Sequence, residues 1–248
     1  MSQKHYLVTG ATAGIGLATA RSLVSAGHKV TITGRDQARL RSAAAALAEA
    51  GSGEVVSLMC DSGDLNQIRA MAQSLQQARV RLDGLVLNAG IFFPQMFSEM
   101  TEENFDQTMA VNHKGPFFSL QALLPVLNNP ASVVFISSVA VRKAFASAAV
   151  YSASKAAFEG ATRVLNLELA ERGIRINSVR PGVTATEIQS KAGMTDEQIA
   201  GLAEAMAVQP LGRILTPADM VPAIDYLLSD ASMGLRDAHL DIDGGFAL

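Results

Sequence analysis

Tyr151 and Lys155 lie four residues apart in a stretch where a helical pattern begins. On a helix, positions i and i+4 share one face, about one turn apart. A positive charge near a phenol favours its ionised form, so the pair would let a tyrosine exchange protons near neutral pH, below its ordinary pKa of about 10. The same spacing also occurs in ordinary amphipathic helices, as a half-buried ring beside a solvated amine. The pair therefore needs support from the rest of the chain.

A pair of serines follows a predicted buried strand upstream of this tyrosine and lysine. The apolar run from Val133 to Ile136 leads directly to Ser137 and Ser138, at the end of a strand where α/β sheets place ligands. A nucleophilic serine is one interpretation, but the chain has no Gly-x-Ser-x-Gly elbow and no persuasive His/Asp partners downstream. A hydroxyl that donates a hydrogen bond is the more economical interpretation.

The beginning of the chain predicts a phosphate-binding turn. Residues 6–8 form a strand-like apolar run, residues 9–16 contain Gly10, Gly14 and Gly16, and a helical pattern follows. Glycines let the backbone approach a pyrophosphate closely, and the free N–H groups of a helix start supply donors and a positive dipole end. Three glycines alone are weak evidence, but their position between a strand and a helix favours dinucleotide binding.

The end of the second predicted strand carries a signal for the type of dinucleotide. The strand over 29–33 leads to Gly34 and then Arg35. An acidic side chain at this point suits the ribose 2′-OH of NAD, whereas an arginine suits the 2′-phosphate of NADP. The sequence therefore favours NADP(H), and Asp36 leaves NAD(H) as an alternative.

The rest of the chain alternates helical and strand patterns, as expected of one α/β domain over 1–248. A long helix is expected over 101–127, bent or interrupted at Gly115-Pro116 because proline cannot donate the helical hydrogen bond. Over 187–215 the pattern loosens into short amphipathic pieces, which indicates a substrate lid or a peripheral helix pair. The other helices are expected near 37–50, 65–79 and 150–171, and the other strands near 54–59, 85–87, 174–179 and 239–242.

The composition excludes several other functions. The chain has 248 residues and a formal net charge of -3, so it offers no basic field for nucleic acid or anionic lipid. Cys60 is its single cysteine, which excludes an intrachain disulfide, and no cluster of residues has metal-ligand spacing. No apolar run approaches membrane-spanning length. These features predict a cytoplasmic protein without metal, nucleic-acid or membrane partners.

Taken in order, the motifs resemble those of the short-chain dehydrogenase/reductase family, in its single-domain, 3-oxoacyl-ACP reductase-like branch. Ser138 lies thirteen residues before Tyr151, as in that family, and the resemblance covers nearly the whole chain. It implies a Rossmann-type doubly wound parallel sheet of about seven strands, with helices on both faces. The matching motifs are Thr9-Gly-x-x-x-Gly14-Ile15-Gly16, Asn88-Ala89-Gly90, Asn112, Ser138, Tyr151-x-x-x-Lys155 and Pro181-Gly182 with Thr186.

The resemblance also implies a role for each catalytic residue. Tyr151 would exchange a proton with the substrate oxygen, which Ser138 would hold. Lys155 would bind the nicotinamide ribose and lower the pKa of Tyr151, and Asn112 would support a water chain to Lys155. The residues implied to bind the cofactor are Gly10, Thr12, Gly14, Ile15, Gly16, Arg35, Asp61, Asn88, Ala89, Gly90, Tyr151, Lys155, Pro181, Gly182, Val183, Thr184 and Thr186.

The sequence thus predicts an NADP(H)-preferring carbonyl reductase or alcohol dehydrogenase for a ketone or secondary alcohol, with 3-oxoacyl thioesters as one candidate class. A homotetramer or homodimer is implied, built on the helices over 101–127 and 150–171. The alternative is a catalytically silent NAD(P)-sensing protein on the same fold. One departure from the family is Leu235-Arg236-Asp237, which replaces a common Thr-Gly-Gln-like approach to the last strand. The residues expected to line an apolar pocket are Phe92, Phe93, Val141, Ala144, Phe145, Val150 and Met194.

Overall fold

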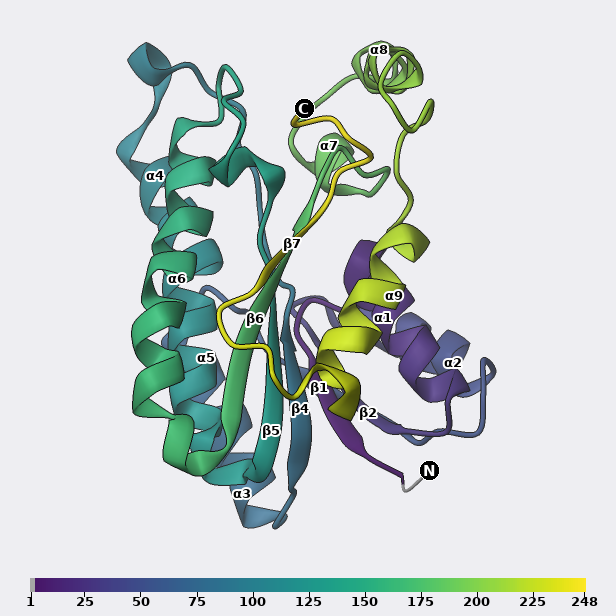
Figure 1. Ribbon diagram of the computed structural model, residues 1–248, viewed down its shortest axis with the longest axis vertical. Coiled ribbons are helices and arrows are strands. Elements are labelled where there is room, and N and C mark those ends of the chain that lie inside the picture. The colour runs from purple at the N-terminus through teal and green to yellow at the C-terminus, as the bar shows by residue number, and fades with distance from the viewer. Residues whose placement is uncertain (1–2) are drawn as a thin grey trace.

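The computed structural model describes residues 3–248 and contains one parallel sheet of seven strands (Figure 1). The strand order is β3-β2-β1-β4-β5-β6-β7, and every neighbouring pair is parallel. The order reverses between β1 and β4, and ligands bind beyond the carboxyl ends of strands at such a switch point. The strands are β1 (His5–Val8), β2 (Lys29–Gly34), β3 (Val55–Met59), β4 (Leu82–Leu87), β5 (Leu127–Ile136), β6 (Ile174–Pro181) and β7 (His239–Ile242).

Helices cover both faces of the sheet, which confirms the predicted doubly wound fold (Figure 1). One layer contains α1 (Gly14–Ser25), α2 (Gln37–Ala48) and α9 (Pro217–Leu228). The other contains α3 (Leu65–Gln77), α4 (Glu102–Met109), α5 (Gly115–Leu123) and α6 (Ala149–Glu168). The short helical turns are η1 (Phe97–Glu99), η2 (Ala110–Lys114), η3 (Leu124–Val126), η4 (Val139–Val141), η5 (Ala170–Arg172) and η6 (Asp230–Ser232).

The hydrophobic core is divided by the sheet into two clusters, and alternate residues of one strand belong to different clusters. On β5, Val134 and Ile136 pack in the α1–α9 layer, while Val133 and Phe135 pack in the α3–α6 layer. A strand buried on both faces needs apolar residues at every position, which explains its continuous apolar run. Each such side chain stabilises the fold by about 1.5–3 kcal/mol on burial. The strand end that carries Ser138 is therefore rigidly held.

The helical segment predicted over 101–127 is interrupted before Gly115-Pro116 as expected, but its end is wrong, because the segment divides into α4, the π-helical turn η2, α5, the 3₁₀ turn η3 and the start of β5. Pro116 has no N–H to donate to the carbonyl four residues earlier, so the regular pattern cannot continue there. The Gly115 N–H instead donates to Ala110, five residues earlier. A Cβ on Gly115 would come within 2.2 Å of the Ser62 carbonyl oxygen, so only glycine permits this close approach. β5 also begins six residues before the expected strand.

Two short helices, α7 (Ile188–Lys191) and α8 (Asp196–Ala207), lie beyond the carboxyl end of the sheet, close to the C-terminus (Figure 1). α8 buries one of its residues, Met206, so its packing against the body is slight. Its start is fixed by a capping box, in which Thr195 and Gln198 satisfy each other's backbone N–H groups. Local hydrogen bonds therefore stabilise α8 more than tertiary contacts do.

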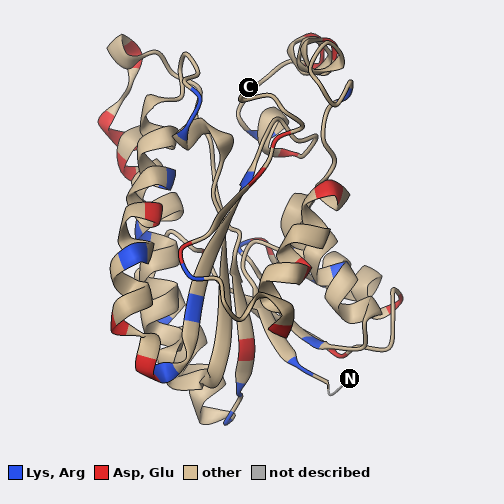
Figure 2. Cartoon of the chain, in the orientation of Figure 1, with Lys and Arg blue, Asp and Glu red and all other residues tan. Residues whose placement is uncertain are grey.

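Charged side chains of both signs are interspersed along the helices (Figure 2). Within residues 3–248, none of the helices is both long enough and apolar enough to cross a bilayer. The same part of the chain contains no group of three or more His, Cys, Asp or Glu side chains arranged to hold a metal ion.

Candidate active site

Four polar side chains that the sequence singled out converge at the carboxyl end of β5. Ser138 follows β5 directly and begins η4, where its hydroxyl oxygen accepts a hydrogen bond from the Ala140 N–H at 3.1 Å. Tyr151 and Lys155 lie on the first two turns of α6, and Asn112 lies in η2. The structure therefore brings together residues from three separate elements.

Lys155 is almost completely buried, with 3% of its surface exposed. Its ammonium group donates to the Ile136 carbonyl at 2.8 Å and lies 5.0 Å from the Phe135 ring centre and 5.9 Å from that of Tyr151. Burial disfavours the charged amine and lowers the pKa of Lys155 to about 8, while the carboxylate of Glu159 opposes the shift. The amine can therefore gain or lose its proton near physiological pH.

Tyr151 is half-buried against Phe92, with the two ring centres 5.0 Å apart. Desolvation raises the pKa of the Tyr151 phenol, and a hydrogen bond with the Ser138 side chain opposes this shift in part. The net direction is opposite to the lowering expected from the neighbouring lysine, because the effect of burial is the larger one. The phenol is therefore a proton donor at neutral pH.

Asn112 is fully buried and connects the loop after β4 to α6. Its carbonyl oxygen accepts from the Ile91 N–H at 2.8 Å, and its amide donates to the Ile91 carbonyl at 2.9 Å and to the Ser154 hydroxyl at 3.1 Å. A Cβ on Gly90 would lie 3.2 Å from the Lys155 ammonium and 3.4 Å from the Asn112 oxygen. Gly90 thus permits both polar groups to approach the same point of the backbone.

The glycine loop and the Asn88–Gly90 turn pack directly on each other. Gly10 has a φ of +62°, and a Cβ there would lie 2.9 Å from the Ala89 Cα. The Asn88 amide donates to the Thr9 carbonyl at 2.9 Å and to that of Gly10 at 3.0 Å, and a Cβ on Gly16 would lie 2.4 Å from this amide. Asn88 therefore fixes the backbone of the glycine loop through these two hydrogen bonds.

The amino terminus of α1 fits a pyrophosphate. Ala13 is its N-cap residue, and no side chain among the described residues caps this helix end. Uncapped N–H groups and the positive dipole end are favourable partners for an anion. Thr186 approaches from the loop after β6, with its methyl group 3.4 Å from the position of a Cβ on Gly14. A dinucleotide phosphate is the anion that this strand-to-helix turn suits.

Two predicted cofactor residues lie at the ends of β2 and β3. Arg35 is exposed directly after β2. Asp36 caps α2 by accepting from the Arg39 N–H at 2.9 Å, so its carboxylate is engaged by the helix start. Asp61 follows β3, and its carboxylate accepts from the Gly63 N–H at 2.8 Å. Thr12 lies beside the end of β2, with its methyl group 2.6 Å from the position of a Cβ on Gly34.

The loop after β6 connects the glycine loop to the base of the 187–215 segment. The Thr184 hydroxyl donates to the Gly182 carbonyl at 3.0 Å, and the Val183 carbonyl accepts from the Leu215 N–H at 3.2 Å. A Cβ on Gly182 would come within 2.7 Å of the Asp243 Cα, which explains the glycine after Pro181. A cavity of about 430 Å³ adjoins this loop, and it is lined by Gly14, Ala185, Thr186, Glu187, Gln189, Ser190, Ile199, Leu202, Ile214 and Pro217.

Sequence reasoning missed two sets of contacts around the site. Phe145 stacks on Phe246 with 5.6 Å between ring centres, and the Lys143 ammonium bonds to the Phe246 carbonyl and lies over its ring. The second set is a buried ion pair between Glu159 and Arg180. The spacing of four residues from Lys155 is the one sequence signal that could have pointed to Glu159, and no signal pointed to Arg180 as its partner.

Comparisons with known proteins agree with this geometry. A family model described as Enoyl-(Acyl carrier protein) reductase matches residues 10–247. Galactitol 2-dehydrogenase of Agrobacterium fabrum is 32% identical over 255 aligned positions, which cover 99% of this chain and 98% of the relative. The 2,3-dihydro-2,3-dihydroxybenzoate dehydrogenase of Escherichia coli is 33% identical over 254 positions, covering 100% and 98%. An NADPH-bound short-chain oxidoreductase from Pseudomonas aeruginosa superposes with a TM-score of 0.89 at 29% identity, covering 98% and 96%.

A doubly wound sheet with a tyrosine, a lysine and a serine at the switch-point edge defines a dinucleotide-dependent oxidoreductase. The chain belongs to the short-chain dehydrogenase/reductase family, and it is an NAD(P)-dependent enzyme acting on alcohol or carbonyl groups.

Proposed function

We propose that this enzyme is an NADP(H)-preferring carbonyl reductase, with Ser138, Tyr151, Lys155 and Asn112 as its catalytic residues. The observation that carries the proposal is the convergence of these four side chains beside an uncapped helix start and a glycine loop. The four side chains can exchange a proton with a substrate oxygen, and the helix start and glycine loop can hold a dinucleotide.

The preference for NADP(H) rests on the end of β2. Arg35 is exposed and available for a 2′-phosphate, whereas the Asp36 carboxylate caps α2 and is less available to a ribose 2′-OH. The similar oxidoreductase of Pseudomonas aeruginosa binds NADPH, which supports the same assignment here. NAD(H) remains the alternative cofactor.

In the proposed mechanism, the glycine loop and the uncapped start of α1 would hold the dinucleotide, which when bound would supply hydride chemistry at the substrate carbon. Tyr151 donates its phenolic proton to the carbonyl oxygen during reduction and accepts a proton during alcohol oxidation. Ser138 fixes the substrate oxygen by a hydrogen bond, and the Lys155 charge stabilises the phenolate that Tyr151 leaves behind. Asn112 fixes the position of α6 relative to the loop after β4, and it supports proton supply to Lys155.

The proposed substrate is a ketone or a secondary alcohol of mostly apolar character, and a 3-oxoacyl thioester is included in this class. Phe92 packs on the reacting Tyr151, and a second pair of rings, Phe145 and Phe246, is anchored by the segment between η4 and α6. Large aromatic surfaces favour apolar substrate groups. The spacing of four between Tyr151 and Lys155 supports carbonyl reduction rather than enoyl reduction, because family members that reduce enoyl groups space this pair further apart.

Two further features belong to this proposal. The segment over 187–215 acts as a substrate lid, because α7 and α8 line the cavity beside the loop after β6 and α8 is weakly packed. The enzyme forms a homotetramer or homodimer, because α4 and α6 expose Phe105, Val164 and Leu167. The single free cysteine, Cys60, is consistent with a cytoplasmic enzyme.

The test is a measurement of NADPH and NADH oxidation with a panel of aliphatic ketones, aromatic ketones and 3-oxoacyl thioesters. We expect turnover with at least one class, and a higher kcat/KM with NADPH than with NADH. Equal kcat/KM values would contradict the cofactor preference. Tight NADPH binding without turnover of any carbonyl compound would contradict the proposed reaction and favour an NAD(P)-sensing role.

A further inference from the structure

A buried carboxylate, that of Glu159, lies on α6 one helical turn beyond Lys155. Glu159 is 7% exposed, although acidic side chains are seldom buried unless they are paired. Positions four residues apart share one helix face, so Glu159 and Lys155 lie on the same side of α6. The reaction as described above gives this carboxylate no role.

Arg180 holds the carboxylate in a bidentate ion pair. Its Nη2 donates to Glu159 Oε2 at 2.7 Å, and its Nε donates to Oε1 at 2.9 Å. Burial by itself raises the pKa of Glu159, but the hydrogen bonds and charge of Arg180, together with the Ser137 side chain and His239, outweigh this effect, so the pKa lies below its ordinary value. Glu159 is therefore ionised at neutral pH.

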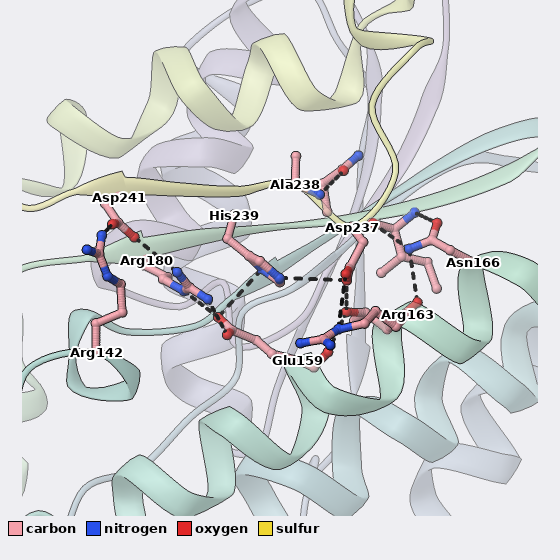
Figure 3. Close-up of polar contacts among 12 residues, drawn as sticks. Arg142, Glu159, Arg163, Asn166, Arg180, Asp237, Ala238, His239 and Asp241 are labelled. Atoms are coloured by element: carbon pink, nitrogen blue, oxygen red, sulfur yellow. Dashed lines mark hydrogen bonds and ion pairs between the residues drawn. The ribbon is translucent and has the colours of Figure 1, made fainter.

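The pair belongs to a chain of charges between α6 and β7 (Figure 3). Figure 3 shows Arg180 and His239 pointing toward Glu159, and His239 Nδ1 lies 3.8 Å from Glu159 Oε1. Asp241 accepts from Arg180 at 3.5 Å. The other charged groups of the network are Arg142, which pairs with Asp241, and Arg163 and Asp237, which pair with each other at 3.5 Å.

Charged side chains also lie on other elements that pack against α6. The elements packed against the other side of α6 carry Asp106 on α4 and His113 and Lys114 on η2. The carboxylate of Glu159 raises the pKa of Lys155 against the lowering by burial. The carboxylate thus favours the ammonium form of Lys155.

We propose that Glu159 is a positioning residue for the proton-transfer step, because its carboxylate keeps Lys155 charged and Arg180 keeps that carboxylate ionised and fixed. The inference rests on the proposed role of Lys155. During reduction the O–H bond of Tyr151 breaks and its proton goes to the substrate oxygen. The charged Lys155 stabilises the resulting phenolate, so reduction slows when the amine becomes neutral.

Through its ion pair with Glu159, Arg180 also connects the end of β6 to α6. Arg180 is the second-last residue of β6 and lies just before the loop over 182–186. A purely structural role for Glu159 would be to hold this loop. The two roles differ in their dependence on pH, since loop displacement lowers activity at every pH, whereas loss of the carboxylate charge acts where Lys155 titrates.

The test is the pH dependence of ketone reduction by Glu159→Gln, which keeps the size of the side chain and removes its charge. With a wild-type pKa of about 8, we expect the alkaline fall of kcat/KM to move down by about one pH unit. Reduction at pH 8 then falls about fivefold relative to wild type, and reduction at pH 6 changes less than about twofold. The control is Glu168→Gln, an exposed acid at the end of α6, which should leave the profile unchanged.

A titration of ¹³Cε-lysine signals by NMR, with Lys155→Met for assignment, measures the amine directly and needs no turnover. It should show the same downward shift in Glu159→Gln, so the inference is tested even if no ketone is reduced. If Glu159→Gln does not fold, Glu159→Met/Arg180→Met removes both charges without leaving one buried alone, and a smaller downward shift is expected because the Arg180 cation is lost as well. An unmoved Lys155 titration in the folded variant, with activity lowered equally at pH 6 and pH 8, would overturn the proposal.

Discussion

Burial favours the neutral forms of both ionisable groups in the proposed site. It raises the pKa of Tyr151 and lowers that of Lys155 to about 8. At pH 7 the phenol is therefore protonated and ready to donate, while most Lys155 amines are still charged. Ketone reduction uses this state directly, whereas alcohol oxidation needs the phenolate and should become faster as pH rises.

Removal of the Tyr151 hydroxyl tests its role as the proton donor. Tyr151→Phe keeps the ring against Phe92 and should lower kcat/KM for ketone reduction by about 10²–10⁴-fold, the usual contribution of a general acid. NADPH affinity, measured by fluorescence titration, should change far less than turnover. Tyr226→Phe is the control, because Tyr226 is exposed on α9. A Tyr151→Phe variant with wild-type activity would remove Tyr151 from the reaction.

Arg35 is expected to discriminate between the two cofactors. Arg35→Ala removes a charge-assisted contact to a 2′-phosphate, a contact of about 1.5–3 kcal/mol, so KM for NADPH should rise roughly 10–100-fold while KM for NADH changes little. Steady-state kinetics with both cofactors checks this. Arg41→Ala, a nearby exposed arginine of α2, is the control. A similar rise for both cofactors would exclude Arg35 as the discriminator.

At the scale of the elements, the sequence predicted the regular parts of the fold and missed those that depend on close packing. The pattern of apolar residues, together with the glycines and prolines at element boundaries, predicted the seven strands and the glycine loop. The π-helical turn η2 was not predicted, because it depends on the approach of Gly115 to the Ser62 carbonyl, 53 residues earlier. Local sequence does not record such a contact, and it gave only the interruption at Pro116.

The same limit applies to the site. Ser138, Tyr151, Lys155 and Asn112 were selected from their order and spacing, and the structure places them together. The partner of Glu159 could not be read from the sequence, because Arg180 lies 21 residues away on another element. The partner of Asp237 could not be predicted either. Asp237 has a φ of +59°, and its carboxylate accepts a 2.6 Å hydrogen bond from Thr162, which lies 75 residues earlier on α6.

The proposed lid segment should open independently of the body, because α8 depends on its capping box. Thr195→Ala removes the side-chain cap and should destabilise α8 by about 1 kcal/mol, so hydrogen exchange over 196–207 should accelerate roughly fivefold. Exchange in β5 should stay unchanged, which serves as the internal control. Thr216→Ala, in the capping box of α9, provides a matched variant outside the lid. Equal acceleration in α8 and β5 would show that the lid opens only with global unfolding.

At the scale of the whole molecule, the two edges of the sheet and the two helical layers differ in what they expose. The α4 and α6 surface presents Phe105, Val164 and Leu167, with 45%, 53% and 80% of their areas exposed. Scattered apolar residues are common on monomers, but three on two adjoining helices form a surface suited to a second copy of the chain. A symmetric contact between α6 helices would cover this surface in both copies.

Leu167→Glu tests the proposed assembly, because it places a charge at the most exposed large apolar side chain of α6. Burial of one leucine contributes about 1.5–3 kcal/mol, and a charge in its place adds a desolvation cost in both copies. The dissociation constant should therefore rise at least roughly a hundredfold, and light scattering after size-exclusion chromatography should show a smaller species. Met59→Glu is the control, since Met59 is 57% exposed on β3 at the opposite edge of the sheet. Dissociation by Met59→Glu but not by Leu167→Glu would place the interface at the β3 edge, because a charge acts on assembly only where the contact buries it.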